Sequence, residues 1–100
     1  MKAVALVDDL MDRSKISNAL DGVTFVRGVE GCAGADLVVV DLSRHAGTVA
    51  GARRAAGSAR IVAYGRHDAV DVLEQARRDG ADAVLTRARF FSDPRAAALT

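Results

Sequence analysis

Short apolar runs alternate with amphipathic segments along the whole chain. The clearest run lies within the stretch from Ala35 to Arg44, where Leu37 and three valines stand between Asp36 and Asp41. An apolar run without alternation is typical of a strand buried on both faces, as in the middle of a parallel sheet. Similar runs predict four further strands, at residues 2–7, 23–27, 60–65 and 83–86.

The segments between these runs predict helices. Residues 10–20 place Met11, Ile16, Ala19 and Leu20 on one apolar face. Residues 46–59 form a weaker, glycine-interrupted helix, and residues 68–79 form the strongest one, with Asp68 as its amino-terminal cap. Ser92, Asp93 and Pro94 open a last helix to residue 100, and residues 28–34 form a loop or one irregular turn. Strands alternating with helices predict one α/β domain over residues 1–100, with parallel strands and helices on both faces of the sheet.

Composition narrows the function classes. The 100 residues carry a formal net charge of +1, and the arginines are scattered, which argues against nucleic-acid binding through a strong basic field. Cys32 is the single cysteine, so an internal disulfide is excluded and a reducing, cytoplasmic setting is expected. The apolar run at the start of the chain is too short for a signal peptide or a membrane span.

Charged residues follow three of the predicted strands. Asp8 and Asp9 end the first, Asp41 ends the third, and Arg87 follows the fifth. Carboxyl ends of parallel strands meet at one edge of the sheet, where α/β folds keep their sites. Three converging carboxylates repel one another unless a cation lies among them, and their hard oxygens suit Mg²⁺. A carboxylate beside Mg²⁺ can act as a nucleophile toward a phosphoryl donor, and Arg87 could hold the phosphoryl oxygens.

These residues resemble the receiver domain of two-component response regulators. The resemblance rests on Val-Ala-Leu-Val-Asp-Asp at 4–9, Asp-Leu-Val-Val-Val-Asp-Leu at 36–42 and Gly-Ala-Asp-Ala-Val-Leu-Thr-Arg at 80–87. It implies a flavodoxin-like, CheY-like three-layer sandwich with strand order 2-1-3-4-5 and a reduced second helix. It further implies that Asp41 accepts phosphate, that Asp8, Asp9 and Asp41 hold Mg²⁺, and that Arg87 contacts the phosphate in place of the family's lysine.

The chain departs from the family pattern at the positions whose side chains respond to phosphorylation in receivers. Gly65 stands where a switching Thr or Ser is usual, and Val84 stands where a Tyr or Phe is usual. Arg87 replaces the Lys, and Ala88 replaces the Pro that follows it. The guanidinium of Arg is planar with donors in a fixed geometry, whereas the ammonium of Lys is a compact point charge. The replacement therefore changes how this residue can contact a phosphate. The combination predicts an atypical receiver or pseudo-receiver.

The sequence therefore predicts a stand-alone receiver-like signalling module that acts through protein contacts, with a kinase or an effector as its partner. The partner would read the fourth helix, the fifth strand and the last helix, and the only catalysis expected is self-phosphorylation and dephosphorylation at Asp41. Two alternatives stay open. One is a flavodoxin-like nucleotide or flavin binder, or an enzyme, that uses the same edge with Gly65, Arg66 and His67. The other is a homodimerisation module.

Several residues have simpler interpretations. Arg87 could form a static ion pair with the acids rather than a phosphate clamp. Tyr64 is expected to be half-buried with a hydrogen-bonded hydroxyl, and Cys32 is expected to be a partly buried filler. His45 and His67 are expected in solvated loops near Asp41. Phe90 and Phe91 either form an exposed docking point or cover the sheet together with the last helix.

Overall fold

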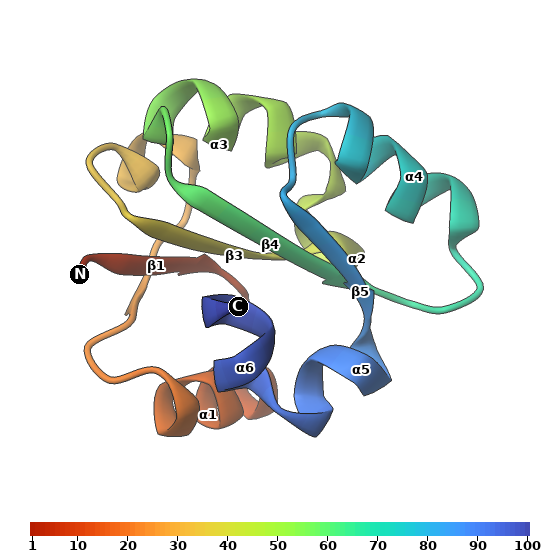
Figure 1. Ribbon diagram of the computed structural model, residues 1–100, viewed down its shortest axis with the longest axis horizontal. Helices are drawn as coiled ribbons and strands as arrows, with labels where there is room; N and C mark the ends of the chain where they lie inside the picture. Colours follow the sequence, from red (N-terminus) through yellow and green to blue (C-terminus); the bar gives the residue numbers. More distant parts are fainter.

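The computed structural model describes residues 1–100 and confirms the predicted sheet: five parallel strands in the order β2-β1-β3-β4-β5 (Figure 1). The strands are β1 (Ala3–Leu6), β2 (Thr24–Phe25), β3 (Leu37–Asp41), β4 (Arg60–Gly65) and β5 (Ala83–Thr86). Leu6 pairs with Val40, Asp41 with Tyr64 and Gly65 with Thr86. The carboxyl ends of these strands are therefore level with one another.

Helices cover both faces of the sheet (Figure 1). One face carries α3 (Val49–Ala56), α4 (Val70–Arg78) and the 3-10 turn η1 (Val29–Cys32), and the other carries α1 (Leu10–Ala19), α5 (Arg87–Ser92) and α6 (Pro94–Leu99). A short helix, α2 (Leu42–His45), follows β3 directly, and the 3-10 turn η2 (Ala46–Thr48) leads into α3. None of these helices is long and apolar enough to cross a bilayer.

Alternate residues of the strands feed two apolar clusters. Val38, Val40 and Ile61 point toward α3 and α4, whereas Val39 and Val62 point toward α1 and α6. All five of these side chains are fully buried. This two-sided burial explains why the strands read as continuous apolar runs rather than as alternating ones.

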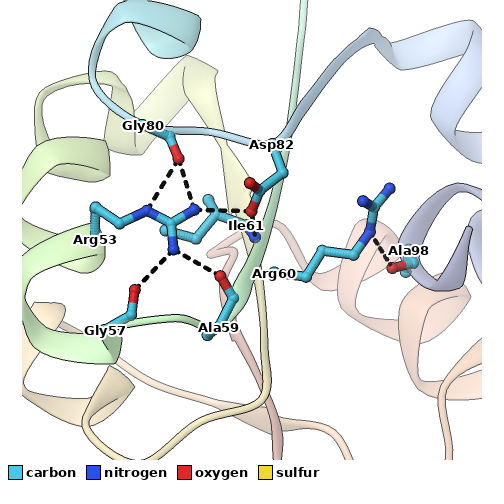
Figure 2. Close-up of polar contacts among 8 residues, drawn as sticks. All are labelled: Arg53, Gly57, Ala59, Arg60, Ile61, Gly80, Asp82 and Ala98. Carbon is cyan, nitrogen blue, oxygen red and sulfur yellow. Dashed lines mark hydrogen bonds and ion pairs between the residues drawn. The ribbon is translucent and has the colours of Figure 1, made fainter.

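An arginine clasp joins three elements at the amino edge of the sheet (Figure 2). The Arg53 guanidinium donates to the carbonyls of Gly57, Ala59 and Gly80 and to Asp82, at 2.7–3.1 Å. The Asp82 carboxylate also accepts the Ile61 N–H at 2.8 Å. The clasp thereby fixes the end of α3, the start of β4 and the α4–β5 turn against one another.

Most predicted elements are present, with shifted boundaries. The predicted helix at 46–59 is shorter, because residues 46–48 form η2 and α3 ends before Gly57, whose φ is +62°. The strongest predicted helix begins at Val70 rather than at 68, because Asp68 does not cap it; the Asp68 carboxylate accepts both hydrogen bonds of Arg66 instead. The segment at 28–34 forms the single turn η1, so the second helix of the fold is reduced as predicted.

Two short helices were not predicted. Asp41 caps α2, and Thr86 caps α5, so each begins directly at the carboxyl end of a strand. Two predictions of partial burial were wrong in degree, because Tyr64 and Cys32 are fully buried. Phe90 is fully buried as well, so it is not an exposed docking point. Phe90 lies on α5 and stacks on Tyr64 with ring centroids 4.7 Å apart, which confirms that it covers the sheet.

Candidate functional site at the carboxyl edge

A polar cavity of about 380 Å³ lies at the carboxyl edge of the sheet. Eight residues line it, all of them polar or charged: Asp8, Asp9, Asp12, Asp41, Ser43, Arg44, Arg66 and Arg87. The four predicted site residues, Asp8, Asp9, Asp41 and Arg87, therefore share one cavity. The loop after β1 supplies Asp8 and Asp9, the last position of β3 supplies Asp41, and the start of α5 supplies Arg87.

Asp41 is 2% exposed, and its carboxylate has a structural partner. Its Oδ1 accepts the backbone N–H of Ser43 at 2.9 Å, which caps α2. An Asp at a helix cap satisfies a backbone donor that has no partner within the helix. The side chain predicted to accept phosphate thus belongs to the start of a helix and is almost covered.

The acid pair after β1 is also engaged. Asp8 Oδ1 lies 2.9 Å from His45 Nε2, and this hydrogen bond holds the pKa of Asp8 below its usual value. Asp9 Oδ1 accepts the backbone N–H of Asp12 at 2.9 Å and caps α1. His45 is consequently not a solvated loop residue as predicted, because it is the last residue of α2 and its side chain is only 12% exposed.

The fold of receivers implies a divalent metal at these acids, but Oδ1 of each acid is already engaged within the chain. No group of three His, Cys, Asp or Glu side chains in the structure lies close enough together to hold a metal ion. The reason is local: Asp8 turns to His45, while Asp9 and Asp41 each cap a helix. The acids share a cavity without forming the predicted Mg²⁺ site in this conformation.

Arg87 binds an acid that the sequence did not single out. Its Nη1 and Nη2 donate to the two carboxylate oxygens of Asp12 at 2.9 and 2.8 Å. The Tyr64 hydroxyl donates to Asp12 Oδ2 at 2.9 Å, so the carboxylate accepts three hydrogen bonds while being 2% exposed. We call Tyr64, Asp12 and Arg87 the buried triad.

Electrostatics in the buried triad favour the charged carboxylate. Burial alone would raise the pKa of Asp12, but the hydrogen bonds from Arg87 and Tyr64 hold that pKa below its usual value. The bond to Asp12 raises the pKa of Arg87, and burial together with the nearby carboxylates raises the pKa of Tyr64. The Arg87 guanidinium also lies 5.5 Å from the centre of the Tyr64 ring and 5.2 Å from that of Phe91.

The triad identifies the acid with which Arg87 pairs. The guanidinium forms a static ion pair, as one interpretation held, but its partner is Asp12 rather than Asp8, Asp9 or Asp41. The predicted apolar face of α1 was wrong at Met11, which is 71% exposed, whereas Asp12 is buried. The spacing of Asp12 and Ile16, four residues apart, was the available signal for a shared inward face.

Gly65, at the end of β4, is fully buried between two leucines. A Cβ built at this position would lie 3.2 Å from Leu73 and 3.3 Å from Leu42. The glycine therefore lets α2 and α4 pack directly against the strand end. A larger side chain, such as the Thr or Ser that receivers usually have here, would require Leu42 or Leu73 to shift.

Comparisons with solved structures show the fold. A response regulator from Burkholderia pseudomallei, crystallised with a phosphorylated aspartic acid, a calcium ion and citrate, is 19% identical and has a TM-score of 0.80; the match covers 100% of this chain and 68% of that one. A response regulator in red light signalling of R. palustris is 13% identical with a TM-score of 0.69, over 95% of this chain and 89% of that one. No model of a protein family and no curated protein matches the sequence. The chain thus has the flavodoxin-like fold of response-regulator receivers.

Proposed function

We propose that this protein is a receiver-like signalling module that acts through protein contacts and is held in one conformation by the buried triad. The observation that carries the proposal is the pair of hydrogen bonds from Arg87 to Asp12. In this proposal the chain keeps the receiver fold as a scaffold, and its signalling state does not depend on phosphate at Asp41.

The first support is that Arg87 is not free to clamp a phosphate. Both of its terminal nitrogens are used by Asp12, in the bidentate geometry that Arg and carboxylate groups favour. Release of Arg87 would leave the carboxylate of Asp12 buried without its cation, which is costly in a protein interior. Phosphate binding at Asp41 would have to compensate for that loss.

The second support is that the parts that respond to phosphate in receivers are replaced by packing. Gly65 has no hydroxyl group, and its place is filled by Leu42 and Leu73. Tyr64, next to it in β4, is fully buried between Phe90 and Asp12, so its ring has no alternative exposed position in this arrangement. Val84 occupies the switching position of β5 with a small aliphatic side chain.

A second candidate function is phosphate acceptance at Asp41, and the polar cavity favours it. Asp41 lines this cavity together with Arg44 and Arg66, whose guanidinium groups are suited to phosphoryl oxygens. The acids do not form a cluster of three metal ligands in this conformation. Millimolar Mg²⁺ alone is expected to leave the amide signals of Asp8, Asp9 and Asp41 unchanged, and a saturable shift there would contradict the closed arrangement of the acids.

Incubation with acetyl phosphate, read by intact mass, separates the two candidates. The proposal predicts no phosphoryl adduct on the wild-type chain, and none on Asp41→Asn. An adduct on the wild type that is absent from Asp41→Asn would establish the second candidate. If that adduct also shifted the amide signals of the buried triad, it would overturn the first. The remaining alternative is binding of a nucleotide or flavin at Gly65 and Arg66. It predicts a coloured protein preparation, or amide shifts when nucleotide is added.

A further inference from the structure

A groove on the α5–α6 side of the sheet leaves β5 partly uncovered. β5 is half-buried along its whole length, whereas its neighbour β4 is buried from Ile61 to Gly65. The cause is the break in the final helical segment: α5 ends at Ser92, Asp93 caps α6, and α6 packs against α1 and α5. Figure 1 shows α6 lying over the middle of the sheet near α1, away from β5.

The groove has a volume of about 540 Å³, which is larger than that of any other cavity in the structure. Its apolar part is made of small side chains and one leucine: Ala83, Leu85, Ala96 and Ala97. Cavities of this volume are within the range that binds ligands. We call this hollow the β5 groove.

Two arginines give the β5 groove its charge. The Arg60 Nε donates to the carbonyl of Ala98 at 2.9 Å (Figure 2). Its Nη2 donates to the carbonyl of Ala97 at 3.4 Å, so that Nη1 is the Arg60 nitrogen left for a partner. The Arg89 side chain is exposed and makes no hydrogen bond or ion pair. The one acid in the lining is Asp93, and its Oδ1 already accepts the Ala96 N–H. The groove therefore offers two guanidinium groups beside an apolar surface.

The open edge of β5 is less suitable than the groove for an added strand. Arg77, from the end of α4, donates to the Val84 carbonyl at 3.4 Å, so a charged side chain lies against β5. Charged side chains laid over an edge strand are a common protection against strand addition. A partner is therefore expected to bind through side chains in the groove rather than by extending the sheet.

We propose that the β5 groove is the docking site for a short extended segment of a partner protein that carries a carboxylate next to an aliphatic side chain. The aliphatic group would cover Ala83 and Leu85, and the carboxylate would bind Arg89 and Arg60. The proposal rests on the signalling function proposed above and specifies the chemistry of its partner. Charge complementarity selects the acidic segment, because the groove's lining carries two arginines and a single, already engaged acid.

The test uses a blocked pentapeptide, Leu-Asp-Val-Glu-Val, titrated into the full chain and followed by amide chemical shifts. The matched probe replaces its acids by Asn and Gln. We expect saturable shifts confined to β5, α5 and α6, and at least fivefold weaker binding of the neutral peptide. Arg89→Gln is expected to weaken binding of the acidic peptide at least fivefold. Arg95→Gln removes an exposed arginine of α6 that lies outside the groove, and it is expected to leave binding unchanged.

A steric variant keeps the charges and tests the groove itself. Ala96→Leu fills the β5 groove from the exposed side of α6. We expect it to weaken binding of the acidic peptide as strongly as Arg89→Gln does, and to leave the melting temperature of the protein unchanged. Absence of shifts up to about 5 mM peptide, shifts at the polar cavity instead, or equal binding to Arg89→Gln would overturn the proposal. So would β5 shifts that follow protein concentration alone, because a second copy would then be the occupant. The acetyl phosphate experiment uses no peptide, so it tests the proposed signalling function independently of peptide binding in the β5 groove.

Discussion

Replacement of Asp12 by Asn perturbs the buried triad with little change in shape. The substitution removes the negative charge opposite Arg87 and places an amide near a guanidinium that can only donate. Breaking a buried ion pair costs about 3–5 kcal/mol. The Arg87 side chain is 39% exposed and can be partly hydrated once released, so we expect a smaller loss than in a fully buried pair, about 2–3 kcal/mol.

The loss is measured as the free energy of unfolding in urea and as the melting temperature. For a domain of this size, 2–3 kcal/mol corresponds to a decrease of roughly 10–20 °C. Arg87→Met and the double variant complete a cycle, and we expect a coupling energy of about 1–3 kcal/mol, because the two residues are in direct contact. Asp21→Asn is the control, since Asp21 is an exposed acid just after the same helix and makes no hydrogen bond with its side chain.

The pH dependence of the free energy of unfolding is a second test of the pair formed by Asp12 and Arg87. The pKa of Asp12 is lower in the folded chain than in the unfolded one, so the unfolded state binds the proton first as pH falls. The stabilisation from Asp12 is therefore complete above the unfolded pKa of about 4 and is lost as pH falls through the folded pKa. The difference between wild type and Asp12→Asn should shrink over that acid range. A cost near zero at neutral pH, with no coupling to Arg87, would refute the reasoning.

Two further substitutions test the packing around the site. Arg53→Met keeps the aliphatic stem but removes every hydrogen bond of the arginine clasp, and we expect a loss of about 2–4 kcal/mol in the free energy of unfolding, with Arg54→Met as an exposed control. A loss equal to that of Arg54→Met would contradict the clasp. Gly65→Thr forces atoms into space held by Leu73 and is expected to cost about 1–3 kcal/mol, whereas Gly47→Ala, in open space, should be neutral. If Gly65→Thr is tolerated at no cost, the strand end is less closely packed than described.

The fold was predictable because its signals are local and repeated. The apolar run before Asp41 identified a central strand, and short strands alternating with helices left few topologies other than a parallel sheet. The position of Gly65 at the end of β4 followed from the same pattern. The observed boundaries differ from the predicted ones where a side chain binds a partner that the sequence did not reveal. Asp68, for example, accepts hydrogen bonds from Arg66 and does not cap α4.

The site was predicted only in outline. Sequence placed Asp8, Asp9, Asp41 and Arg87 at one edge, and all four line the same cavity. It could not show that Arg87 would pair with Asp12, because the two positions are 75 residues apart in the sequence. In addition, Asp12 points into the protein, whereas an acid on a helix usually faces the solvent. Nor could it show how Asp41 is engaged, since capping of α2 depends on a helix too short to leave a periodic pattern.

The central claim is that the buried triad holds one conformation regardless of what occupies Asp41. The most direct test compares amide spectra of the wild type with and without beryllofluoride and Mg²⁺, a mimic of phosphate on an aspartate, using Asp41→Asn as the control. The account predicts that the signals of Gly65, Val84 and Arg87 stay where they are in the wild type. Shifts of these residues and of α5 that disappear in Asp41→Asn would show a switching receiver and contradict it.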